Sequence, residues 1–116
     1  MSSPLLRYKL VFFSPPSSLP SCKTAIFAAG AGRYPGPGNY TEVCFASTGI
    51  SQFKPGEGAK PHIGEVGKLT EQEEVRCEIL CVGEQVVRKA VEALKRSVSH
   101  SIHDDRGRHL GGRSGR

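Results

Sequence analysis

The sequence has no long apolar run, and this limits the classes of protein that it can be. No stretch approaches the roughly 20 apolar residues that a membrane-spanning helix needs. The run from Leu10 to Phe13 is also too short for the hydrophobic region of a signal peptide. We therefore expect a soluble, cytoplasmic protein. Only 37% of the 116 residues are hydrophobic, which is little for a compact domain, so one small domain with a non-core segment is expected.

The cysteines lack the spacing of a metal centre. The chain has four cysteines and no CxxC pair. In a strand, Cys77 and Cys81 would lie about 13 Å apart, too far to bind one ion directly. Cys22 or Cys44 could act as a nucleophile only beside a base, and His62 is the one histidine before the C-terminal tail. We expect buried free thiols, no catalytic residue, no metal and no cofactor.

A P-loop is also missing, although the region from Gly30 to Gly67 holds nine of the 14 glycines. No glycine run leads into a helix, and no Lys-Ser/Thr pair follows one. Turn geometry is the leading explanation for these glycines. Binding of a phosphate ligand between subunits, near Lys54, Lys60 and Lys68, remains the alternative.

The net charge of +5 does not indicate a nucleic-acid-binding surface. Residues 97–116 carry four arginines against two aspartates, so the rest of the chain is only mildly basic. No aromatic residues are interleaved with these arginines, and nucleic acid is therefore an unexpected partner. The histidines of this tail, His100, His103 and His109, are interpreted as solvated rather than as metal ligands.

Hydrophobic periodicity predicts five main elements. The first strand, apolar on both faces, should be central or covered, and Ser17 or Ser18 should cap the first helix, which Gly30 and Gly32 end. The third strand directs Val75 and Cys77 to one face and Arg76 and Glu78 to the other. No period is visible from Thr48 to Ile63, and Glu65–Leu69 could add a short extended piece. The predicted elements are strand Tyr8–Phe13, helix Leu19–Ala29, strand Asn39–Ser47, strand Glu74–Val82 and helix Glu84–Arg96.

The order β-α-β-β-α predicts an α+β fold, a ferredoxin-like split βαβ sandwich. Its last strand is missing or degenerate, because the chain after Lys95 is rich in Arg, Gly and Ser. We expect a domain over residues 1–96 and a disordered tail over 97–116. The last strand would pair with the first, so its absence would leave Lys9–Phe13 as an open apolar edge.

Several short motifs resemble the middle domain of the Nif-three-like family (YqfO-type, "GTP cyclohydrolase type 2 homologue"). The resemblance covers roughly Tyr8 to Lys95. Its motifs are Tyr8–Phe13, Ala28–Gly32, Gly38-Asn39-Tyr40, Gly49, Phe53-Lys54-Pro55, Pro61-His62-Ile63-Gly64, Gly67, Glu73–Arg76 and Glu78.

The resemblance implies a fold of the PII/CutA-like type, which tends to form trimers and also occurs as a free-standing small protein. The family's dinuclear metal site lies in flanking domains without counterpart here. The resemblance therefore implies a non-enzymatic binding or regulatory module, assembled as a homotrimer or docked on a larger protein through the open strand edge. Two alternatives remain. One is a regulatory domain like the C-terminal domain of ATP phosphoribosyltransferase, and the other is a metal-dependent hydrolase homologue.

The residues that we expect at loops or subunit contacts follow from the same motifs. Arg76, Glu78 and Tyr40 are the polar residues placed at subunit contacts. The full set is Gly30, Gly32, Asn39, Tyr40, Gly49, Phe53, Pro55, Pro61, Gly64, Gly67, Arg76 and Glu78.

Overall fold

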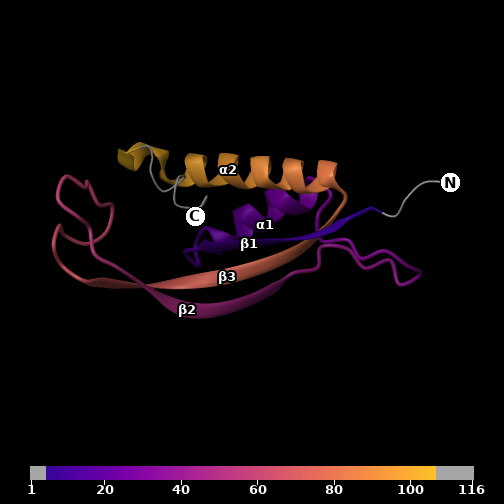
Figure 1. The fold of residues 1–116 in the computed structure, drawn as a ribbon, viewed down its shortest axis with the longest axis horizontal. Coiled ribbons are helices and arrows are strands. Elements are labelled where there is room, and N and C mark those ends of the chain that lie inside the picture. The colour runs from indigo at the N-terminus through magenta and orange to yellow at the C-terminus, as the bar shows by residue number, and fades with distance from the viewer. Residues whose placement is uncertain (1–4, 107–116) are drawn as a thin grey trace.

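The computed structural model describes residues 5–106, with side chains described for residues 5–98. It is a small α+β fold with a three-stranded antiparallel sheet and two helices (Figure 1). The elements are β1 (Arg7–Ser14), α1 (Leu19–Ala28), β2 (Phe45–Phe53), β3 (Thr70–Val82) and α2 (Glu84–Arg106). The predicted α+β class and the order β-α-β-β-α are confirmed.

The sheet order is β1-β3-β2, with β3 antiparallel to both neighbours. β1 and β2 therefore run parallel to each other with β3 between them. In the described part of the chain β1 pairs with β3 alone. Among the described residues the first strand is thus an edge strand. The prediction of a central strand is wrong, whereas the open edge expected at Lys9–Phe13 is present in this part of the chain. Val11 and Phe13 on its outer face are 37% and 46% exposed.

The core lies between the sheet and the two helices. Along β3, Val75, Cys77, Ile79 and Cys81 are buried while Arg76 is exposed, which confirms the predicted alternation. Successive side chains of a strand project to opposite faces of the sheet, so the buried β3 residues share the face that the two helices cover. The core cluster is Phe12, Cys22, Ile26, Ala31, Cys77, Ile79, Cys81, Ala90 and Leu94.

The helices begin where the sequence indicates. Ser18 is the N-cap residue of α1, but its side chain makes no capping hydrogen bond. Pro20 lies in the first turn of the helix, Ala29 is the C-cap, and Gly30 follows with φ +104°. α2 begins at Glu84, whose carboxylate accepts a 3.0 Å hydrogen bond from Arg88 Nε, as the i,i+4 spacing predicts.

The second strand is displaced from its predicted position. It covers Phe45–Phe53 rather than Asn39–Ser47. Asn39 and Glu42 have φ values of +53° and +55°, which extended backbone cannot adopt. The expected extended piece at Glu65–Leu69 is also wrong, since the N–H of Lys68 donates to the carbonyl of Glu65 in a turn.

The second helix is longer than predicted, since it passes Arg96 and ends at Arg106. Val98 is half-buried against the core, so the first part of the expected irregular segment is helical. The remainder of the predicted tail, residues 107–116, lies outside the described residues. The boundary at residue 96 therefore stays a prediction.

Candidate binding surface

The sheet side that faces away from the helices forms a continuous surface, called the open face here. Direct partners in an antiparallel pair project to the same side, so the register defines its members. Val11 pairs with Glu78 and Phe13 with Arg76, while Phe45 and Ser47 of β2 lie opposite the same two β3 residues. The open face comprises Arg7, Lys9, Val11, Phe13, Phe45, Ser47, Arg76, Glu78 and Leu80.

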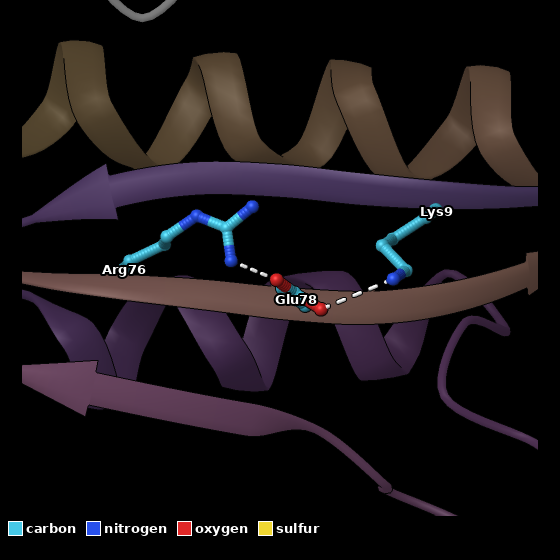
Figure 2. A network of polar contacts seen from close by, with 3 residues as sticks. All are labelled: Lys9, Arg76 and Glu78. Atoms are coloured by element: carbon cyan, nitrogen blue, oxygen red, sulfur yellow. Dashed lines mark hydrogen bonds and ion pairs between the residues drawn. The ribbon is translucent and has the colours of Figure 1, made fainter.

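Three charged side chains form a network on this face (Figure 2). Glu78 lies between two cations: its Oε2 accepts from Arg76 Nη1, and its Oε1 lies 3.3 Å from Lys9 Nζ. The Glu78 side chain is only 20% exposed, whereas Lys9 is 65% exposed. The network links β1 to β3 and holds two cations beside one carboxylate.

Apolar side chains flank the network. Val11, Phe13 and Phe45 are 37%, 46% and 62% exposed. Exposed apolar groups gathered on one sheet face are typical of contact surfaces rather than of free monomer surface. The open face therefore combines an apolar patch with a central ion-pair network.

A hollow of about 210 Å³ lies at one end of the open face. Arg76 and Phe13 border it, and the hydroxyl groups of Ser47 and Ser51 add hydrogen-bonding capacity. Its lining residues are Phe13, Ser47, Thr48, Gly49, Ile50, Ser51, Glu74 and Arg76. The hollow is large enough for a partner's side chain.

The four cysteines are free, and three are buried in the core, as predicted. Burial raises the pKa of Cys22 and of Cys81. Burial, together with the neighbouring Cys44 thiol, raises the pKa of Cys77 to about 12. A thiol with such a pKa is protonated at neutral pH and is a poor nucleophile.

In the part of the chain that the structure describes, no group of three or more His, Cys, Asp and Glu side chains is placed to hold a metal ion. No helix among the described residues has the length and apolarity to cross a membrane.

The structure separates the sequence-predicted site residues into distinct places. Arg76 and Glu78 meet on the open face, and Gly49 and Phe53 belong to β2. Tyr40, 69% exposed, lies in the α1–β2 loop, where its carbonyl accepts from the N–H of Tyr34. Asn39 adopts a turn conformation beside it. Tyr40 is thus not grouped with Arg76 and Glu78 in the same element or network.

The remaining predicted residues lie in turns and loops, where they determine the backbone conformation. Gly30 follows α1, and the N–H of Gly32 donates 2.8 Å to the carbonyl of Leu80. The N–H of Gly67 donates to the carbonyl of Pro55, which closes the β2–β3 loop. A Cβ on Gly64 would lie 2.6 Å from Thr70 Oγ1, and Pro61 is exposed in the same loop.

Sequence reasoning expected Lys9–Phe13 to contact a partner as an open strand edge, and it missed that Lys9, Val11 and Phe13 share one sheet face with Phe45. The signal was present in the first strand, which is apolar on both faces although only one face enters the core. For Phe45 the signal was hidden, because the predicted strand was displaced along the chain.

Comparison with known proteins identifies relatives. No family model matches the sequence. The "GTP cyclohydrolase 1 type 2 homolog" of Bacillus subtilis (strain 168) is 44% identical over 70 residues, covering 60% of this chain and 18% of the relative. The protein of the same name from Halalkalibacterium halodurans is 40% identical over 90 residues, covering 78% of this chain and 23% of the relative.

A solved structure agrees with these relatives. A Bacillus cereus protein related to NIF3 superimposes with a TM-score of 0.67 at 30% identity, over 83% of this chain and 23% of that one. The chain is homologous to one segment of NIF3-related proteins. The resemblance found in the sequence is confirmed. The chain spans only about a fifth of the length of these NIF3-related proteins, between 18% and 23%.

Proposed function

We propose that this chain is a non-enzymatic binding or regulatory module that assembles as a homotrimer through the open face. The observation that carries the proposal is the patch of Val11, Phe13 and Phe45 around the Lys9–Glu78–Arg76 network. Exposed apolar and aromatic side chains on one face, together with ion pairs that satisfy the charges between them, are features of subunit interfaces.

The topology supports a fold of the PII/CutA-like, ferredoxin-like type. β1 and β2 are parallel with β3 inserted between them, which is a split β-α-β unit. In this interpretation the chain corresponds to the middle domain of NIF3-related proteins. The four free thiols are compatible with a reducing compartment, and we propose a cytoplasmic location for the protein.

Light scattering of the purified full-length chain tests the assembly. The expected mass is three times 12.5 kDa. Phe45→Glu should give monomers, because it places a charge in the patch without altering a core residue. Val66→Glu, at a 48% exposed loop position, is the matched control and should remain a trimer. A monomeric wild-type chain at all concentrations would refute the trimer.

The relatives' name mentions GTP cyclohydrolase, and the second candidate is therefore a hydrolase acting on GTP, for which we propose metal dependence. This candidate requires metal in the purified protein at a stoichiometric level and turnover of GTP. Metal analysis together with an assay that follows turnover of the guanine ring of GTP separates it from the binding module. A regulatory domain like that of ATP phosphoribosyltransferase would instead show a histidine-dependent rise in Tm.

A further inference from the structure

The outer edge of β1 is a place where another strand can add to the sheet. Among the described residues, β1 pairs only with β3, so its second row of backbone N–H and C=O groups has no strand partner there. Unpaired strand edges bind extended peptides through main-chain hydrogen bonds, and alternate side chains supply specificity.

The side chains beside this edge differ between the two faces. Toward the helices, Tyr8 and Leu10 are half-buried and pack against the core, as do Val87 and Val98 of α2. A strand added here would therefore project apolar side chains toward α2. Burial of each such side chain favours binding.

On the open face the same edge is basic. Arg7 is exposed, and Lys9 is 65% exposed. Glu78 is shared between Lys9 and Arg76, so one carboxylate balances two cations, and Arg7 adds a third positive charge. An acidic side chain on the incoming strand would complement this charge.

We propose that the β1 edge binds an extended segment of a partner polypeptide that alternates apolar residues toward α2 with acidic residues opposite Lys9 and Arg7. This inference rests on the proposed binding module and deepens it by naming a partner chemistry for the β1 edge, where Arg7 and Lys9 of the open face lie beside the incoming strand.

Two other occupants fit the edge less well. A second β1, antiparallel and centred on Leu10, would make Lys9 of both copies diagonal neighbours on one face, and like charges there oppose pairing. The chain's own residues 107–116 contain three arginines, no acidic residue and Leu110 as the one aliphatic side chain. Neither segment offers the apolar and acidic alternation that the edge selects.

A labelled seven-residue peptide tests the proposal on the full-length chain. The peptide carries valine or isoleucine at the helix-facing positions and glutamate opposite Lys9 and Arg7, and a second peptide has lysine in place of both glutamates. We expect fluorescence anisotropy to show the acidic peptide binding about tenfold more tightly, which corresponds to about 1.4 kcal/mol. We also expect binding of the acidic peptide to slow hydrogen exchange of the β1 amides.

A charge exchange localises the site. Arg7→Glu should weaken binding of the acidic peptide and strengthen binding of the lysine peptide. Lys60→Glu makes the same charge change in the β2–β3 loop and should leave both affinities unchanged. Equal affinities for both peptides, or equal effects of the two substitutions, would overturn the proposal.

Two further outcomes count against it. Binding that occurs only after residues 107–116 are removed would show that the chain's own tail fills the edge. A concentration-dependent dimer abolished by Arg7→Glu would show that a second copy does. If the wild-type chain is a trimer by light scattering and binds neither peptide, the edge inference fails while the proposed trimer stands.

Discussion

The ring of Phe27 fills the space that a side chain on Gly32 would need. A Cβ built on Gly32 would lie 2.7 Å from Phe27 Cε1 and 3.0 Å from the carbonyl oxygen of Val43. Gly32 also has φ +80° and makes two backbone hydrogen bonds, to Leu80 and from Val43. A glycine at this position therefore allows the chain that follows α1 to make a hydrogen bond with β3.

Replacement of this glycine should destabilise the fold. Gly32→Ala adds the strain of a left-handed residue to a contact with backbone, and we expect a loss of about 2–4 kcal/mol in the free energy of unfolding. Gly67→Ala is the control, since Gly67 has the same φ but open space around its Cβ position. It should cost about 1–2 kcal/mol. Denaturant unfolding measures both, and equal losses would contradict the role of the Phe27 contact.

The Lys9–Glu78–Arg76 network should contribute modestly to stability. Glu78→Gln removes the charge between two cations, and we expect a loss of about 0.5–1.5 kcal/mol that shrinks at 1 M salt. Glu65→Gln is the matched control, because the Glu65–Lys68 pair, 3.0 Å apart, is 70% and 72% exposed. Its removal should change stability by less than about 0.5 kcal/mol. A salt-independent effect at Glu78 would argue against the network.

The raised pKa of Cys77 makes stability depend on pH in the alkaline range. The unfolded thiol loses its proton near pH 9, while the buried thiol keeps it up to about 12. The unfolded state therefore binds fewer protons between these values, and stability is full below about pH 9 and falls as the pH rises. The fall from one such thiol is at most about 1.4 kcal/mol per pH unit.

Denaturant unfolding at pH 8, 9 and 10 tests this dependence. The free energy of unfolding of Cys77→Ala should fall less steeply with rising pH than that of the wild-type chain, because the other titrating groups are common to both proteins. Parallel curves for the two proteins would show that Cys77 does not titrate differently on unfolding.

The part of α2 beyond Arg96 should stabilise the fold, because it carries Val98. Because Val98 is half-buried against the core, Val98→Ala should lower the free energy of unfolding by about 0.5–1.5 kcal/mol. Val66→Ala, at an exposed loop position, should have no measurable effect. A chain truncated after Arg96 should lose at least as much as Val98→Ala, and unchanged stability of that truncation would refute the contribution of the added turns.

The sequence predicted those elements whose apolar pattern matches their burial. β3 alternates because one face enters the core, and α2 shows one apolar stripe with the Glu84–Arg88 pair outside it. The predicted position of β2 was wrong because the side chains of Ala46 to Ile50 are exposed on both faces of the strand. The sequence there shows no alternation of apolar and polar residues. Its strand is specified by pairing with β3, a long-range contact that local pattern does not encode.

The candidate surface was predictable only in part, for a similar reason. Arg76 and Glu78 stood out as polar residues in a strand with one buried face. Their grouping with Lys9 depends on the register of β1 against β3, and register is fixed by the whole sheet rather than by either strand alone.

The exposed half of the β2–β3 hairpin has a consequence for how the molecule opens. Ala46–Ile50, Glu71 and Glu73 are exposed on strands whose other ends join the core. Since few buried groups resist separation there, amides near the hairpin tip should exchange through local fraying, and those of β3 beside Cys77–Cys81 only when the whole chain unfolds. The amides of this single pair of strands therefore have two levels of protection against hydrogen exchange. A protease should cut the connecting loop, residues 54–69, while the helix-covered part stays folded.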